Sequence, residues 1–419
     1  MPYEHPDPVD GPVGRGLWAR ADRVMPGGGI YLSRSADMAG RGVQPGFIVA
    51  AEGCRVTDAD GRTYVDLMGA NGPNVLGYRH PEVEQAVDET RARITTASLF
   101  PDLLVEVIET LVEATPPMSW GVVAKNGSEV VSLGARVARQ ATGRRAVIAF
   151  EQAYHGNDPE LALSPPPGPL VELTDDIHRL PWNGAQELLD HAADHGDRIA
   201  AMVCNPLHQS PRTTTVEASA DFVAAIAEVR ERHGCLVVFD DVRHGMRLHP
   251  AASFVPMDLR PDVVALGKAI GNGHSVSALL GTEDVRRAAR KIMFTSTYMF
   301  EAPPMAAAIA TRTIYDRDDA FTHMEAMGRR LWAGIADAAA GAGVAIELSG
   351  PPTMPTLLFT DGDGVAQART FARAAAEQGA ILPPFLNWNL SLAHAETDID
   401  AVVGAATAGL TAVADEHLG

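Results

Sequence analysis

The feature that most constrains this 419-residue chain is an alternation of short apolar runs with amphipathic helical stretches between about residues 100 and 320. The helical stretches include Glu129–Gln140 and Ala218–His233, and the second has apolar residues at i, i+3 and i+4 spacing. The apolar runs are Ala146–Phe150, Ile199–Cys204, Cys235–Phe239, Val263–Leu266 and Ser277–Gly281. This alternation predicts an α/β fold with a mostly parallel central sheet flanked by helices. Ligands of such sheets bind beyond the carboxyl ends of the strands.

The N-terminal part follows a different pattern. Residues 1–45 predict an extended arm with a glycine-rich bend at Pro26–Gly29. The next stretch, Phe47–Asp66, alternates around the turn Asp58–Gly61 and predicts a β-hairpin.

The C-terminal part predicts a smaller α+β domain, with a long helix near Ala320–Ala342 and a strand at Thr356–Phe359. We therefore expect three parts. They are an arm and hairpin over 1–75 that packs with the small domain, a large ligand-binding domain over 76–320, and the small C-terminal domain over 321–419.

The charge balance restricts the partners of this chain. Acidic residues outnumber basic ones by 53 to 34, which gives a formal charge of −19. Such a surface repels nucleic acid and anionic membranes, so neither is an expected partner. An anionic small molecule remains compatible, because one or two local arginines can outweigh a diffuse field.

Cysteine usage and the chain start predict a reduced, cytoplasmic protein. Cys54, Cys204 and Cys235 are too few and too scattered for a disulfide framework, and no pair has metal-ligand spacing, so no metal site is expected. The first six residues are polar and contain two prolines, unlike a signal sequence. No uncharged apolar run reaches the roughly 18 residues that span a bilayer.

Two apolar runs that end in charged residues carry the strongest chemical signal. Asp240 follows Val237–Phe239, and Gly267 and Lys268 follow Val263–Leu266. On neighbouring strands, these ends would bring Asp240 and Lys268 into one crevice. A buried ammonium and carboxylate are costly unless something needs both. Pyridoxal phosphate does, because its aldehyde condenses with a lysine amine and its protonated ring nitrogen binds a carboxylate. A structural ion pair is the alternative.

The phosphate of such a cofactor would need its own cradle. Asn126, Gly127 and Ser128 precede a helical run that begins near Val130. Glycine lets the backbone approach closely, and a helix N-terminus offers free N–H groups and the positive end of its dipole. Ser128 would add a hydroxyl donor. An ordinary helix cap is the alternative.

Two further segments carry side chains suited to a cofactor. Tyr154 and His155 follow the run Ala146–Phe150, where the tyrosine ring would stack on a pyridine ring or lie in a surface loop. Thr297 belongs to the hydroxyl cluster Thr295–Tyr298 before a helix expected near Pro303. This cluster would bind phosphate or simply form a β-turn.

Taken in order, these segments resemble the class III branch of the fold-type-I pyridoxal-phosphate enzymes, and among them most closely the glutamate-1-semialdehyde aminomutases. The similarity covers nearly the whole chain. The matching segments are Pro26–Gly28, Val65–Leu67, Gly72–Pro73, Gly77–Pro81, Asn126–Glu129, Arg136–Arg139, Thr142–Arg144, Tyr154–Gly156, Phe239–Val242, Gly245, Arg247 and Leu266–Gly273.

The resemblance implies a role for each matching residue. It makes Lys268 the Schiff-base lysine and proton shuttle, and Asp240 the partner of the ring nitrogen. The other cofactor contacts that it implies are Gly127 and Ser128 at the phosphate, Tyr154 and His155 at the ring, and Thr297 at the phosphate of the neighbouring subunit. It therefore implies a homodimer with shared active sites. Arg34 would grip a substrate carboxylate, a task suited to a guanidinium.

The chain departs from the family mainly around the substrate. Asn71 stands where the aminomutases often carry an aromatic residue, and Asn205-Pro206 replaces their Glu-Pro. The segments Thr297–Pro303 and Pro383–Asn389 are bulkier and less acidic than their usual counterparts. These changes predict a different, more apolar substrate.

The sequence thus predicts an aminotransferase that moves an amino group between a carboxylate-bearing amine or amino acid and a keto acid or aldehyde. Three alternatives stay open. They are an intramolecular aminomutase, an epimerase or racemase, and a non-catalytic subunit that only binds the cofactor.

Overall fold

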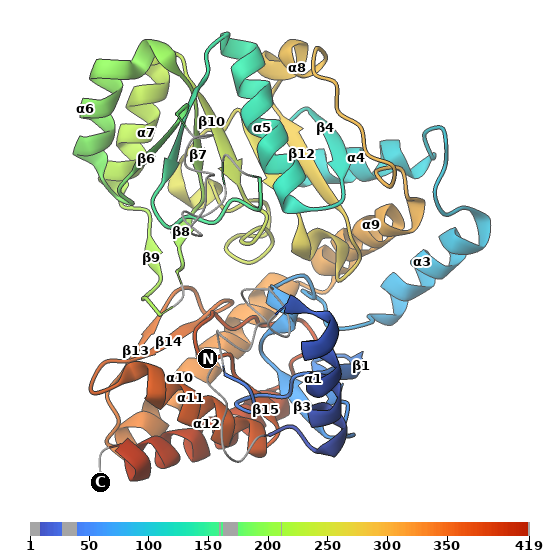
Figure 1. Ribbon diagram of the computed structural model, residues 1–419. Coiled ribbons are helices and arrows are strands. Elements are labelled where there is room, and N and C mark those ends of the chain that lie inside the picture. Colours follow the sequence, from blue (N-terminus) through green and yellow to red (C-terminus); the bar gives the residue numbers. More distant parts are fainter. Residues whose placement is uncertain (1–8, 27–39, 159–160, 162–174, 211, 418–419) are drawn as a thin grey trace. The chain divides into compact units, whose positions relative to one another are not determined.

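The computed structural model describes residues 9–26, 40–158, 161, 175–210 and 212–417, and it divides into two compact units (Figure 1). The terminal unit comprises Met1–His80, Gln209–Thr215 and Asp319–Gly419, and the sheet unit comprises Pro81–His208 and Val216–Asp318. The boundaries predicted from the sequence lie after residues 75 and 320. In the structure the chain passes from one unit to the other after His80 and after Asp318, and the short segment Gln209–Thr215 also belongs to the terminal unit.

The sheet unit contains a seven-stranded sheet in the order β4-β12-β11-β10-β7-β5-β6. Its strands are β4 (Trp120–Ala124), β5 (Ala146–Phe150), β6 (Ile177–Leu180), β7 (Ile199–Cys204), β10 (Leu236–Asp240), β11 (Val263–Leu266) and β12 (Ser277–Gly281). The five apolar runs therefore form strands as predicted. All neighbouring pairs are parallel except those of β12, which runs antiparallel to β11 and β4. The link between β11 and β12 holds only the short helix η7 (Lys268–Gly271), too little for a parallel crossover.

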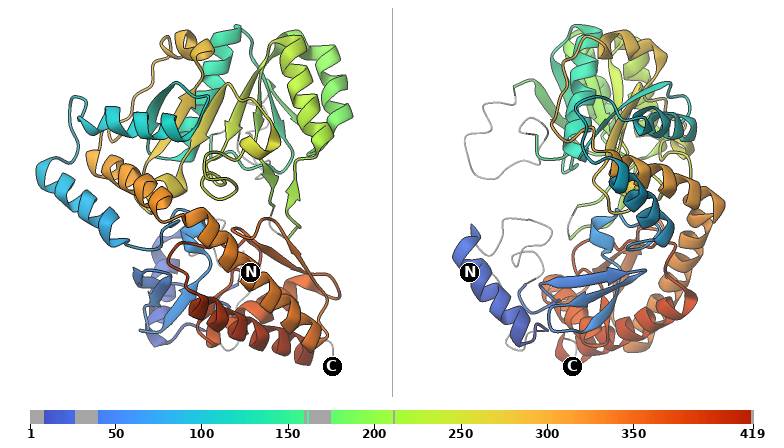
Figure 2. Two further views of the ribbon diagram at one scale, coloured as in Figure 1. Left: turned by 180° about the vertical axis from the view of Figure 1, so that it is seen from behind. Right: turned by 90° about the vertical axis from the view of Figure 1, so that its right-hand side faces the viewer.

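The helices of the sheet unit can be followed from two further directions in Figure 2. They are α3 (Pro81–Arg93), α4 (Leu103–Ala114), α5 (Gly127–Thr142), α6 (Ala185–His195), α7 (Ala220–His233), α8 (Glu283–Ala289) and α9 (Ala302–Arg317). Helix α5 lies across β7, β10, β11 and β12. It approaches closely because Gly134 has no Cβ, which would lie 2.8 Å from Cγ1 of Val238. The predicted mostly parallel sheet flanked by helices is confirmed.

The terminal unit contains a second sheet in the order β1-β2-β3-β15. Its strands are β1 (Ile48–Glu52), β2 (Arg55–Asp58), β3 (Thr63–Asp66) and β15 (Ala380–Ile381). The predicted hairpin is present as the antiparallel pair β2 and β3, but its first half is divided, because Gly53, with φ of +58°, turns the chain between β1 and β2. The predicted turn Asp58–Gly61 joins β2 to β3, where the Asp58 carboxylate accepts hydrogen bonds from the backbone N–H groups of Asp60 and Arg62.

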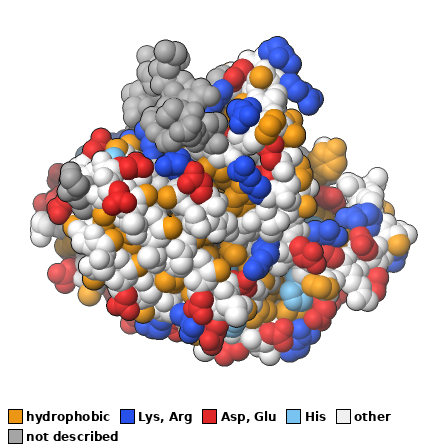
Figure 3. Space-filling view, turned by 90° about the horizontal axis from the view of Figure 1, so that it is seen from below, with side chains coloured by type: hydrophobic (Ala, Val, Ile, Leu, Met, Phe, Trp, Pro, Cys, Tyr) orange, Lys and Arg blue, Asp and Glu red, His pale blue; other side chains and the backbone are white. Residues whose placement is uncertain are grey.

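The rest of the terminal unit is α+β. Helix α1 (Pro12–Val24) precedes the sheet, so the prediction of an extended arm was wrong for this part, where a proline at the first helical position starts a helix. The C-terminal part contains α10 (Ala320–Ala342), β13 (Ile346–Ser349), β14 (Thr356–Phe359), α11 (Gly364–Glu377) and α12 (Glu396–His417). Within the described residues, α12 alone is long and apolar enough to cross a membrane, by length and composition only. It packs along α10 and α11 and buries Ile399, Val402 and Leu410, as a core helix does. On the face drawn in Figure 3, acidic and basic side chains are interspersed.

Candidate active site

The two charged strand ends meet at one edge of the sheet. Strands β10 and β11 are parallel neighbours, and Asp240, the last residue of β10, is in register with Ala265. Lys268 follows two residues after β11 and opens η7. Because parallel strands place their carboxyl ends at the same edge, both residues lie at one edge of the sheet, where Asp240 acts electrostatically on Lys268.

Lys268 combines backbone strain with an altered basicity. Its φ of +46° lies in the left-handed region, which costs a residue with a Cβ about 1 kcal/mol or more and is typical of functional positions. Burial first, and then the nearby Arg243, lower the pKa of the Lys268 ammonium to about 8, against the opposing effect of Asp240. A sizeable fraction of Lys268 is therefore neutral, and nucleophilic, slightly above neutral pH.

Asp240 is held by a histidine rather than by the lysine. Its Oδ2 lies 2.8 Å from Nδ1 of His155, and its Oδ1 accepts a hydrogen bond from the backbone N–H of Val242 at 3.1 Å. Asp240 is only 7% exposed and His155 only 1%. Within the described residues, Asp240 and Lys268 form no ion pair, so the simple structural pair is not what the structure contains. Nε2 of His155 is buried without a hydrogen-bond partner there.

The segment that follows β10 buries further charge, most of which sequence reasoning missed. Burial lowers the pKa of both the Arg243 and the Arg247 guanidinium to about 10. It also lowers the pKa of His244 well below its usual value and raises that of Asp241 to about 6. Neither ring nitrogen of His244 has a partner among the described residues. The sequence signal that could have revealed these buried groups is the run of ionisable residues that directly follows the apolar strand β10.

The first turn of α5 has the form expected of an anion cradle. The Asn126 side chain accepts a hydrogen bond from the backbone N–H of Glu129, whose carboxylate accepts one in return from that of Asn126. Gly127 opens the helix, and a Cβ there would lie 2.6 Å from Cγ1 of Val242. Ser128 Oγ accepts a hydrogen bond from the backbone N–H of Asn157 at 3.0 Å, which leaves its own hydrogen to donate.

The structure gives fewer contacts for the other residues that the sequence predicted for the site. Tyr154 is 53% exposed, its hydroxyl lies 3.4 Å from Oδ1 of Asn157, and burial and then Asp240 raise its pKa. Thr297 is exposed in the turn before α9. Asn71 belongs to the terminal unit, at the end of η3 (Gly69–Asn71) with φ of +68°. Arg34 lies outside the described residues.

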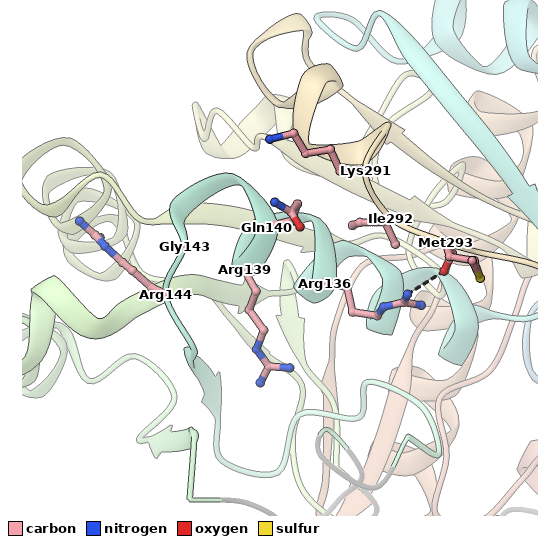
Figure 4. Close-up of a pocket in the computed structure, with 8 residues that line it drawn as sticks. All are labelled: Arg136, Arg139, Gln140, Gly143, Arg144, Lys291, Ile292 and Met293. Atoms are coloured by element: carbon pink, nitrogen blue, oxygen red, sulfur yellow. Dashed lines mark hydrogen bonds between the residues drawn. The ribbon is translucent and has the colours of Figure 1, made fainter.

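A cavity of about 480 Å³ lies elsewhere in the sheet unit, at the C-terminal half of α5 (Figure 4). Its three arginines donate hydrogen bonds to backbone carbonyls. Arg136 donates to the carbonyl of Met293, Arg139 to that of Arg145, and Arg144 to those of Ile199 and His233. Figure 4 shows the side chains of Arg144 and Arg136 pointing in different directions. This cavity contains none of the residues expected to do chemistry.

Comparison with known proteins places this arrangement in a family. Residues 38–392 match the aminotransferase class-III family, and the chain belongs to it. Aminopentol aminotransferase of Sphingopyxis macrogoltabida is 33% identical over 95% of this chain and 93% of its own. A glutamate-1-semialdehyde 2,1-aminomutase of Desulfosudis oleivorans is 30% identical over 94% and 97%. The FumI protein of Sphingopyxis sp. MTA144, solved in its PLP internal aldimine form, is 32% identical with a TM-score of 0.94, and the similarity covers 98% of each chain.

The fold and the family together define the class of enzyme. The chain is a fold-type-I, pyridoxal-phosphate-dependent class III aminotransferase, whose substrates are small-molecule amines and keto acids. The described residues fit the cofactor. They offer a buried lysine of lowered pKa, a carboxylate at the adjacent strand end, and a helix start at which only glycine fits beside Val242.

Proposed function

We propose that this aminotransferase moves an amino group between a carboxylate-bearing or largely apolar amine and a keto acid or aldehyde, at the edge where β10 and β11 end. The observation that carries the proposal is the placement of Asp240 at the end of β10 and of Lys268 just after the end of the adjacent parallel strand β11, in a buried environment that lowers the pKa of Lys268 to about 8.

Each of these residues has a definite task in the proposal. Pyridoxal phosphate supplies an aldehyde that condenses with amines and a protonated ring that withdraws electrons from the substrate carbon. Lys268 would hold the cofactor, and its neutral Nζ would accept the proton that leaves the substrate carbon. Asp240 stabilises the proton on the ring nitrogen, and His155 orients Asp240 through the 2.8 Å hydrogen bond.

The phosphate and the ring face are assigned to other parts of the sheet unit. Gly127 and Ser128 hold the phosphate at the start of α5, where the backbone N–H groups lack partners within the helix. Tyr154 covers the ring face. Thr297, exposed on its own subunit, reaches the phosphate of a second subunit, so the proposal includes a homodimer with shared active sites. The cytoplasm is the proposed compartment.

The substrate is assigned by class only. Arg34 would bind a substrate carboxylate and Asn71 would lie beside the substrate. The bulky, weakly charged segments Thr297–Pro303 and Pro383–Asn389 favour an amine with an apolar body. The name of the 33% identical relative, an aminopentol aminotransferase, supports an amine substrate that is not an ordinary amino acid.

An intramolecular aminomutase is the second candidate, because a relative 30% identical over 94% of the chain carries that name. To separate the two, the pyridoxamine-phosphate form of the protein is incubated with candidate carbonyl compounds. Transamination predicts one released amino product per cofactor and the return of the pyridoxal spectrum. If the amino group reappears only on the skeleton that delivered it, the transferase proposal fails and the aminomutase stands. Conversion of one enantiomer to the other would identify an epimerase, and a spectrum indifferent to all amines would indicate a non-catalytic subunit.

A further inference from the structure

Three histidines meet at the outer edge of the sheet unit, away from the residues assigned to the cofactor. His178 lies on β6, the last strand of the sheet, and His191 and His195 lie four residues apart on one face of α6. The ring centroids are 4.7 Å apart between His178 and His191, 4.7 Å between His191 and His195, and 5.9 Å between His178 and His195. All three side chains are partly buried. We call them the histidine cluster.

One hydrogen bond ties the helix to the strand. Nδ1 of His178 lies 2.6 Å from Nε2 of His191. Such a bond needs one N–H group and one lone pair, so only one of the two facing nitrogens carries a proton. If both rings become cationic, two N–H groups face each other and the bond is lost.

The surrounding charges do not compensate for this repulsion. Burial lowers the pKa of His178, and His195 and Arg198 lower it further, against the opposing Asp176. Asp176 is already paired with Arg145, at 2.7 Å.

The pKa of His191, on the helix, is lowered for the same kinds of reason. Burial lowers the pKa of His191, followed by His178 and His195, against the opposing Asp194. Both facing rings therefore resist protonation while the contact is intact.

We propose that the histidine cluster is an acid-sensitive latch, which fastens α6 to the edge strand β6 near neutral pH and releases it in mildly acidic solution. The strand held by the latch, β6, is hydrogen-bonded to β5, the strand that leads to Tyr154 and His155. The proton is the assigned ligand, since no group of three or more His, Cys, Asp or Glu within the described part of the chain is arranged to hold a metal ion.

The direction of the effect follows from proton linkage. A released histidine has an ordinary pKa of about 6.5, and the latched rings bind protons less readily. Between the lowered pKa values and pH 6.5, the released form therefore binds more protons. The latch is fully present above about pH 6.5, and its opening constant rises by up to tenfold per pH unit for each extra proton.

Hydrogen exchange of the cofactor-loaded enzyme, made without a histidine tag, tests the latch between pH 7.5 and 5.0. After correction for the intrinsic exchange rate, amides of residues 177–195 should lose protection by about tenfold per pH unit below about pH 6.5. Amides of α5 serve as the internal reference. In His191→Gln, the side-chain amide takes the place of Nε2 in the hydrogen bond without titrating, so the pH dependence should flatten. His178→Asn replaces Nδ1 in the same way. The exposed His417→Gln of the terminal unit should leave the dependence unchanged.

Three results would overturn the latch. They are pH-independent protection of residues 177–195 in the wild-type enzyme, an unchanged pH dependence in His191→Gln and His178→Asn, and protection by added Zn²⁺ at pH 7.5 that either substitution removes. The last result would show a metal site instead. Should His191→Gln fail to fold, the wild-type profile and His178→Asn still decide.

Discussion

Two regions of the molecule differ in how deeply their strands are buried. One is the edge of the large sheet where β10 and β11 end, and the other is the small sheet of the terminal unit. Strands β10 and β11 are almost completely buried, with Val237, Val238, Phe239, Val263 and Val264 all at 0% exposure. Strand β1 is largely exposed, and its pairing with β2 is shifted between Ile48 and Ala50. The buried edge thus holds charged side chains in fixed positions, whereas the exposed strand β1 tolerates irregularity. We therefore expect substitutions at the first to change chemistry and those at the second to change only stability.

The largest effect is expected for Lys268→Ala. Removing the amine deletes both the attachment point and the proton carrier, so kcat should fall by at least about 10³-fold. The protein should also lose the 400–430 nm absorbance that an attached cofactor gives. Lys291→Ala, a change at an exposed lysine, is the matched control and should retain both. Wild-type absorbance in Lys268→Ala would contradict the assignment.

Asp240→Asn should be next in size. It removes the charge that stabilises the ring proton while keeping the shape, and kcat should fall by about 10²-fold or more. His155→Gln, which acts only through Asp240, should have a smaller effect on kcat and little effect on KM. If the two variants leave the pH profile of kcat unchanged, the proposed role of the pair in holding the ring proton is wrong.

Gly127→Ala tests the cradle at the start of α5. The new Cβ would lie 2.6 Å from Cγ1 of Val242, so the helix start must shift and cofactor affinity should fall about tenfold, roughly 1.4 kcal/mol. Val242→Ala removes the obstructing atoms. The double variant should bind the cofactor more tightly than Gly127→Ala alone, and additive losses would exclude steric conflict as the cause.

Gly53→Ala should have the smallest effect on function. Its φ of +58° is strained for alanine, but a new Cβ would have space, because its nearest neighbour is Cβ of Ala393 at 4.0 Å. The free energy of unfolding should fall by about 1 kcal/mol, with kcat and cofactor affinity unchanged. A loss of activity as large as that of Gly127→Ala would remove the contrast between the two regions.

The same contrast explains what the sequence could and could not predict. The strands Ala146–Phe150, Ile199–Cys204 and Val263–Leu266 begin and end as predicted, because a strand buried on both faces needs a continuous apolar run. The antiparallel direction of β12 and the separate strand β1 depend on a short link and on one glycine conformation, which apolar patterns do not encode.

The candidate active site also has a part that the sequence could predict and a part that it could not. The adjacency of Asp240 and Lys268 followed from strand ends and family motifs. The hydrogen bond between His155 and Asp240, and the buried Arg243 and His244, arise from contacts between segments far apart in sequence or from burial, which single residues do not reveal.

The chain contains only three lysines, Lys125, Lys268 and Lys291, which makes the central claim directly measurable. Lys125 is ion-paired with Glu301 at 2.7 Å, and Lys291 is exposed. Borohydride reduction of the cofactor-loaded enzyme, followed by peptide mapping, shows which lysine carries the cofactor. The account predicts one pyridoxyl group per chain, on Lys268. Stoichiometric label on Lys125 or Lys291 instead would contradict it.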